Sequence, residues 1–176
     1  MAEPIEIDVW QGEIAELEVD AIVVAANESL FMTAGAAASV KRHGGYGVER
    51  AAVDQGPVPP GTAVATAGGD LAAPYVIHAV AVGHDRVADP DTFVSAVRTA
   101  LGFAEPLQLR RIAIAPLGTE HGVFTPAEAA AILVPAVVEA ARDTPIESIV
   151  FAAPHPSDIR ALGDALRSVR AGAGLP

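Results

Sequence analysis

The alternation of short apolar runs with longer helical segments restricts the fold of this chain more than any other feature. Residues Ala21–Ala26 form a continuous apolar run, which is typical of a central strand covered on both faces. Ile5–Trp10 instead alternates apolar and polar residues, which predicts a strand with one solvated face. We predict further strands at Thr62–Thr66, Tyr75–Val80, Ile112–Ala115 and Ile149–Ala153.

Helix-start signals lie between the predicted strands. Asp89 stands before Pro90–Ala104 as the N-cap of a helix that has proline at its first position. Thr125–Glu128 has the spacing of a capping box, again with proline first. Pro135 lies inside this second helix, and we expect it to kink or break the helix. We predict further helices at Ala36–Arg42 and Pro156–Arg170.

This order of elements predicts an α/β fold. Strands that alternate with helices form a mixed or parallel sheet with helices on both faces. The length of 176 residues fits one domain, and an apolar content of 51% is enough for a sizeable core. We expect a single domain over residues 1–170 and a flexible tail over residues 171–176.

The composition excludes several kinds of site. The chain has no cysteine, so it has no disulfide, thiolate nucleophile or cysteine-based metal site. Its five histidines show no metal-ligand spacing, and we expect neither a metal nor a cofactor. The net charge of −11 disfavours a general attraction to nucleic acids or anionic membranes. Lys41 is the only lysine, so a phosphate site would need backbone N–H groups or an arginine.

Targeting signals are not evident either. Met1–Pro4 lacks the basic and apolar regions of a secretory signal. No apolar run reaches the roughly 18 residues of a membrane helix. We expect a cytoplasmic monomer that does not bind membranes.

The first loop of interest follows Ala21–Ala26. Ligands of open α/β sheets bind beyond the carboxyl ends of the strands, where such loops converge. Small residues occupy Ala34–Ala37, just before a predicted helix start. A helix N-terminus offers unpaired N–H groups and a positive dipole end, which suit a pyrophosphate. Taken alone, these residues are better explained as an alanine-rich helix start without a ligand.

The second loop of interest is Pro116–Phe124, which leads into the capped helix. It contains Gly118 and Gly122 and leads into a helix start, just as the first loop contains a glycine and leads into a helix start. Two such loops on neighbouring strands could clamp a diphosphate, although two ordinary strand-to-helix turns would have the same pattern. Neither a P-loop nor a strand followed by G-x-G-x-x-G is present, which argues against P-loop NTPases and dinucleotide-dependent dehydrogenases.

Several runs resemble the signature of the macro domain family. They are Gln11–Ile14, Val19–Asn27, Thr33–Ala36, Pro74–His78, and Leu117–Thr119 with Gly122 and Phe124. They stand in the family's order and spacing, and the match extends from Ile5 to Ile159. The resemblance implies a three-layer α/β/α fold with a mixed, roughly six-stranded sheet. It also implies ADP-ribose as the ligand.

The resemblance gives a role to each matching residue. Glu13 matches the acid that accepts a hydrogen bond from the adenine amino group, and Ile14 supplies the amide beside it. Asn27 matches the asparagine that holds the distal ribose. The implied phosphate-binding residues are Thr33, Ala34, Gly35 and Ala36 in the first loop, and Gly118, Thr119, Glu120, His121, Gly122, Val123 and Phe124 in the second.

Some residues depart from the family's pattern. Glu13 replaces the usual aspartate, and Val24 stands where many members have the first asparagine of Asn-Ala-Ala-Asn. Ala37 stands where many hydrolases carry an aspartate that helps to activate water. Glu120 and His121 stand where the second loop usually has glycine and then isoleucine or valine. These departures bear on the catalytic route more than on binding.

The resemblance implies a hydrolase that removes ADP-ribose from modified macromolecules. Its substrates would be acidic side-chain esters on protein, with thymidine-linked ADP-ribose on DNA as a second class. We expect Asn27, Glu120 and His121 to carry catalysis by orienting or deprotonating a water. A non-catalytic reader of ADP-ribose is the alternative, which Ala37 favours, and an O-acetyl-ADP-ribose deacetylase is another. In each case the partner is ADP-ribose, free or attached to a macromolecule.

Several polar residues also have structural interpretations. Asn27 fits a turn cap as well as a ribose contact. Glu120 and His121 could both point to solvent and leave only their amides for the ligand. We expect His78 to be a hydrogen-bonded core residue and His84–Arg86 to be a solvated loop.

Overall fold

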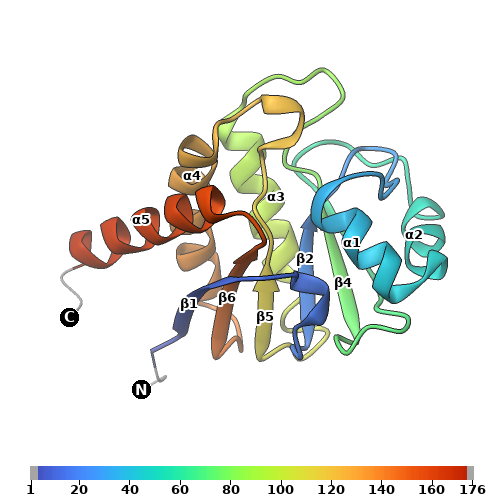
Figure 1. The fold of residues 1–176 in the computed structure, drawn as a ribbon, viewed down its shortest axis with the longest axis horizontal. Helices are drawn as coiled ribbons and strands as arrows, with labels where there is room; N and C mark the ends of the chain where they lie inside the picture. The colour runs from blue at the N-terminus through green and yellow to red at the C-terminus, as the bar shows by residue number, and fades with distance from the viewer. Residues whose placement is uncertain (1–3, 174–176) are drawn as a thin grey trace.

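A mixed six-stranded sheet forms the middle layer of the computed structural model, which describes residues 4–173 (Figure 1). The strand order is β1-β6-β5-β2-β4-β3. Of the described strands, only β3 runs antiparallel to its neighbour, at one edge. The strands are β1 (Glu6–Gln11), β2 (Ala21–Ala25), β3 (Ala63–Ala67), β4 (Tyr75–Ala79), β5 (Arg111–Ile114) and β6 (Ser148–Ala153).

Helices cover both faces of the sheet, as Figure 1 shows. One face carries α1 (Gly35–Gly44) and α2 (Tyr46–Val53), and the other carries α3 (Pro90–Gly102), α4 (Pro126–Ala141) and α5 (Pro156–Gly172). Alternate residues of a strand point to opposite faces, so β2 contributes to two cores. Ala21 and Val23 pack with α3, α4 and α5, whereas Ile22 and Val24 pack with α1. The predicted three-layer α/β/α fold is confirmed.

The predicted strands and helix caps agree closely with the structure. Each predicted strand is present, with ends shifted by at most one residue. The Asp89 carboxylate accepts a hydrogen bond from the Asp91 N–H at 3.1 Å, which makes it the N-cap of α3. Thr125 and Glu128 form the reciprocal capping box of α4. These caps fix the helix starts that follow the loops after β4 and β5.

Helix α2 is absent from the sequence prediction because glycines flank and interrupt it. Gly45 precedes the helix at φ 92° without a side-chain cap, and Gly47 lies in the first turn. A glycine costs a helix about 1 kcal/mol relative to alanine, so the local signal is weak. The helix forms because Val48 and Ala52, one turn apart, are both buried against the domain.

Two other helix predictions need correction. Pro135 does not break α4, which runs without interruption from Pro126 to Ala141. Pro135 has no N–H group to donate to the carbonyl of Ala131, one turn earlier. Because both residues are exposed, water can bond to that carbonyl instead. Helix α5 ends at Gly172 rather than Arg170, and residues 174–176 of the predicted tail lie outside the described part. The bounds of the domain and tail stay predictions.

None of the helices within residues 4–173 has both the length and the hydropathy that a bilayer crossing requires.

His78 is a hydrogen-bonded core residue, as predicted. It lies on β4 with 1% of its surface exposed. Its Nε2 is 3.0 Å from the hydroxyl of Thr66 on the neighbouring strand β3. Burial disfavours the imidazolium form and lowers the pKa of His78 to about 4. His78 is therefore neutral in the folded protein at physiological pH.

Acid should destabilise the fold through His78. The unfolded chain takes up a proton at the ordinary histidine pKa of 6.5, whereas the folded chain does so only at about 4. Stability therefore falls by about 1.4 kcal/mol per pH unit as pH drops from 6.5 towards 4. Urea unfolding of the wild type and of His78→Gln at pH 7 and pH 5 should reveal a smaller loss in the variant. Equal losses in the two proteins would contradict the assignment.

Candidate ligand-binding cleft

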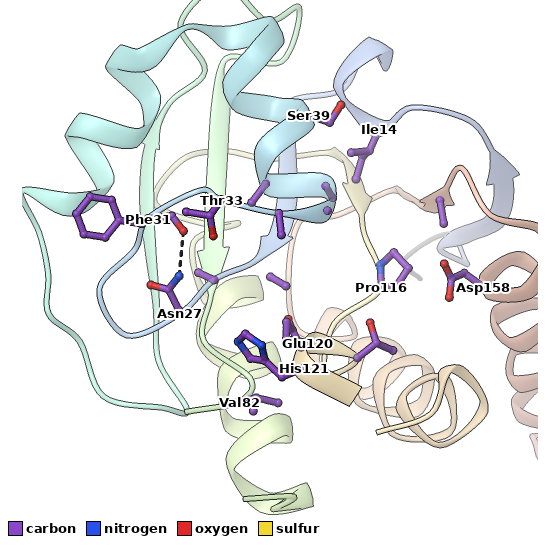
Figure 2. A pocket seen from close by; sticks show the side chains of 18 of the residues that line it. Ile14, Asn27, Phe31, Thr33, Ser39, Val82, Pro116, Glu120, His121 and Asp158 are labelled. Carbon is purple, nitrogen blue, oxygen red and sulfur yellow. Dashed lines mark hydrogen bonds between the residues drawn. The ribbon is translucent and has the colours of Figure 1, made fainter. Parts of the chain in front are cut away.

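A cleft of about 850 Å³ opens where chain segments leave the carboxyl ends of β2, β4, β5 and β6 (Figure 2). This is the edge of the sheet at which the sequence predicts a site. The predicted site residues that line the cleft are Glu13, Ile14, Asn27, Thr33, Ala34, Gly35, Ala36, Thr119, Glu120 and His121. Gly118, Gly122, Val123 and Phe124 are not among its lining residues.

The N-terminus of α1 forms one wall of the cleft. Gly35 opens the helix at φ 57°, a left-handed conformation that favours glycine. Ala34 is the N-cap residue and provides no side-chain cap. The N–H groups of Gly35, Ala36 and Ala37 have no acceptor among the described residues. This helix start therefore presents free donors and a positive dipole end to the cleft.

The second wall comes from the loop after β5, and its glycines shape it without touching the cleft. A side chain at Gly118 (φ 83°) would collide with the ring of Phe93 on α3, at 2.1 Å from a ring carbon. The ring of Phe124 packs against the same Phe93 at a centroid distance of 5.8 Å. The N–H groups of Gly122 and Phe124 are hydrogen-bonded back to carbonyls of this loop. These residues therefore hold the loop in shape.

The remaining amides of this loop are free. Within residues 4–173, the N–H groups of Thr119 and His121 have no acceptor, and no side chain caps the short 3₁₀ turn at Glu120–Gly122 (η2). His121 lies at φ 57°, so right-handed and left-handed residues follow one another, a pattern that makes N–H groups converge. Strands β2 and β5 are parallel neighbours, so this wall adjoins the one formed by α1.

Asn27 follows β2 and is held by its own loop. Its side-chain amide donates a hydrogen bond to the carbonyl of Phe31 at 3.0 Å, as Figure 2 shows. The Oδ1 atom on the same side chain is buried and accepts no hydrogen bond. Asn27 thus bonds within its own turn, which was the alternative to a ribose contact, and keeps one unused acceptor.

Glu120 carries the most unusual electrostatics in the cleft. Both carboxylate oxygens are buried and accept no hydrogen bond of good geometry. Burial raises the pKa of Glu120, and the nearby N–H groups of Glu120 and Gly118 oppose this shift only in part. The interpretation that the Glu120 side chain points to solvent is therefore wrong. His121, for which the same interpretation was given, is exposed.

The unpaired buried side-chain atoms of the described residues all lie in this cleft. They are Oδ1 of Asn27 and both carboxylate oxygens of Glu120. Each is a hydrogen-bond acceptor, and native proteins rarely leave such atoms unpaired. The cleft therefore combines unpaired buried acceptors at Asn27 and Glu120 with free donors along two of its walls.

Glu13 lies with Ile14 at the η1 turn (Ile14–Glu16), between β1 and β2. The hydroxyl of Ser39 on α1 donates to its carboxylate at 2.5 Å. Ile14 is 3% exposed and belongs to the core under α1. The buried isoleucine thus anchors the turn that presents the acid.

The cationic side chains that line the cleft are arginines and histidines, and lysine is not among them. Arg42 and Arg86 are the arginines that line it, and neither forms an ion pair within the described part of the chain. Lys41 is engaged by Glu49 at 2.9 Å. Residues 4–173 contain no group of three or more histidine, aspartate or glutamate side chains placed to hold a metal ion. Ala37, in the cleft wall, supplies no acid.

Sequence reasoning missed the segments after β4 and β6. Val82, His84 and Arg86 line the cleft from the first of these, and His155 and Asp158 from the second. His84 and Arg86 are also exposed, so the predicted solvated loop borders the cleft. The signal that could have found them was topological, since both segments leave parallel strands at the same edge.

Comparison with known sequences gives consistent matches. A family model described as Macro domain matches residues 23–133. An uncharacterised protein of Mycobacterium bovis is 34% identical over 164 residues, which cover 93% of this chain and 46% of that protein. A macro domain-containing protein of Cupriavidus necator is 39% identical over 153 residues, which cover 82% of this chain and 88% of that protein. The chain thus spans less than half the length of the mycobacterial relative.

Comparison with solved structures supports the same fold. The crystal structure of a Trypanosoma brucei macrodomain in complex with ADP-ribose has a TM-score of 0.83 and covers 92% of this chain and 69% of that one. The sequence identity is 23%, so this likeness speaks for the fold alone.

Proposed function

The chain belongs to the macro domain family, and on this basis we propose that its cleft binds ADP-ribose and that the protein hydrolyses ADP-ribose from modified macromolecules. The observation that carries the proposal is the pair of adjoining walls with free backbone N–H groups. An anion with two phosphates satisfies donors on both walls at once.

The diphosphate would lie between the α1 N-terminus and the loop after β5. Gly35 and Ala36 supply N–H groups from one side, and Thr119 and His121 from the other. Backbone donors need no lysine, which fits a chain whose single lysine is engaged by Glu49. Gly122, Val123 and Phe124 would not touch the ligand. They would hold the loop that presents the Thr119 and His121 amides.

The two ends of the ligand would differ in their partners. Glu13, with the Ile14 amide, would take the adenine amino group, although its carboxylate already accepts from Ser39. A carboxylate oxygen can accept more than one hydrogen bond, so the two contacts are compatible. Asn27 would hold the distal ribose through its unused Oδ1 atom.

Hydrolysis would take place at C1″ of the distal ribose. A water oxygen attacks C1″, the bond from C1″ to the ester oxygen breaks, and the carboxylate leaves with the electron pair. The proton of the water passes to a base, for which Glu120 and His121 are candidates, or to a phosphate oxygen of the ligand. Because a carboxylate is a good leaving group, modest assistance is sufficient, and acidic side-chain esters on protein are the first substrate class.

Other substrates and a second function follow from particular residues. Thymidine-linked ADP-ribose on DNA is a second class, although a net charge of −11 weakens duplex binding. Ala37 favours the alternative of a reader that binds ADP-ribose without cleaving it, because no acid stands at that point of the cleft wall.

Removing one donor should weaken binding. Ala36→Pro deletes the Ala36 N–H in the first turn of α1, where proline is tolerated. The loss of a hydrogen bond to a charged group should raise the Kd for ADP-ribose by about tenfold in isothermal titration. Ala127→Pro makes the same change in the first turn of α4, outside the cleft, and should leave the Kd unchanged. Equal affinities of both variants would exclude the α1 amide as a contact.

An ADP-ribosylated protein modified on acidic side chains separates hydrolase from reader. The wild type should release the label with multiple turnovers, and Asn27→Ala should release it at least tenfold more slowly. Gln55→Ala removes an amide side chain that also bonds backbone carbonyls, but away from the cleft, and should keep full activity. Retention of the label alongside calorimetric binding of ADP-ribose would establish the reader instead.

A further inference from the structure

We propose that the Glu120 carboxylate binds the vicinal hydroxyls of the terminal ribose, so that the cleft selects ligands in which both hydroxyls are free. This inference rests on the proposed binding of ADP-ribose. It replaces the interpretation in which Glu120 offers the ligand only its backbone amide. It makes Glu120 a specificity-determining residue of the cleft and leaves His121 or a phosphate oxygen to take the proton of the attacking water.

The unpaired atoms in the cleft carry this inference. Oδ1 of Asn27 and both oxygens of Glu120 are acceptors, and all are buried without a partner. A diphosphate offers only acceptors at neutral pH and cannot satisfy them. Ribose hydroxyls are donors, and a carboxylate with two free oxygens can accept one hydroxyl on each. These acceptors therefore fit the sugar and not the diphosphate.

The negative charge of Glu120 also favours a sugar, and not a phosphate, beside its carboxylate. Glu120 takes part in no ion pair within residues 4–173, so no cation offsets its carboxylate. A phosphate placed against it would face an uncompensated negative charge. Neutral hydroxyl donors instead stabilise the carboxylate at no Coulombic cost. The diphosphate must then lie against the amides of the two walls, with the neighbouring Glu120 side chain directed away from it.

The backbone positions Glu120 for such a contact before any ligand arrives. Gly118, two residues earlier, is fixed against Phe93, and Phe124 packs on the same ring. Asn27 and Glu120 lie on loops that leave the neighbouring parallel strands β2 and β5 (Figure 2). The Glu120 oxygens are covered in the ligand-free protein, so a sugar would reach them through a side-chain rotation and not through a movement of the anchored loop.

The inference restricts the substrate class. A terminal ribose that is attached only through C1″ keeps both vicinal hydroxyls and can satisfy Glu120. A ribose that is acylated or phosphorylated at either hydroxyl loses a donor and adds bulk in a buried position. Mono-ADP-ribosyl groups are thus favoured, and O-acetyl-ADP-ribose is disfavoured.

A titration with two nucleotides tests the assignment. ADP contains the adenosine and diphosphate of ADP-ribose but lacks the terminal sugar. Isothermal titration of the wild type, Glu120→Gln and Glu120→Ala should show an affinity for ADP-ribose about tenfold weaker in the alanine variant, with a smaller loss in the glutamine variant. The affinity for ADP should be unchanged in both. Glu105→Gln makes the same charge change at an exposed site outside the cleft and should alter neither affinity.

The other outcomes separate this inference from the function on which it rests. Tighter binding of both nucleotides by the Glu120 variants would mean that the carboxylate competes for the phosphate position, and would overturn the inference. Unchanged binding of ADP-ribose by folded variants, as judged by thermal unfolding, would also overturn it while leaving the proposed function intact. A wild type that binds neither nucleotide would remove both.

Discussion

The parallel pairing of β2 with β5 is the constraint on which the cleft depends. It brings two strand-to-helix segments to one edge of the sheet, and each arrives with backbone N–H groups that the fold leaves unbonded. Left-handed residues at Gly35, Gly118 and His121 set the direction of the chain there. In the proposed function, these amides let an acidic chain bind a nucleotide diphosphate without relying on cationic side chains.

The ligand-free cleft carries a free-energy cost. Each buried acceptor without a partner costs about 1–3 kcal/mol, and a charged one costs more. Asn27 and Glu120 hold the unpaired buried side-chain atoms of residues 4–173, and both line the cleft. A ligand that donates to these atoms recovers the cost, so stability and binding are linked at this point. The rest of the fold tolerates the cost because β2 and β5, the strands beneath, are largely buried.

Much of the fold could be predicted because its local and tertiary preferences agree. The apolar run of β2 and the caps at Asp89 and Thr125 all have the structure that their sequence favours. Helix α2 could not be predicted, since Gly45 and Gly47 weaken its signal and only packing stabilises it.

The candidate site was partly predictable for a similar reason. Motifs close together along the chain led to the loops after β2 and β5, which do border the cleft. They did not lead to His155 or Asp158, which approach only because β6 lies beside β5. The direction of the Glu120 side chain was also open, because it depends on the left-handed turn at His121 and on the anchoring of Gly118 by Phe93.

The central claim is that main-chain amides, rather than arginines, bind the diphosphate. Arg42 and Arg86 are the arginines that line the cleft, so their joint replacement by alanine tests it most directly. Titration of Arg42→Ala/Arg86→Ala with ADP-ribose should give a Kd within about threefold of the wild type at physiological salt. A loss of about a hundredfold or more in a folded variant would contradict the claim and assign the diphosphate to the arginines.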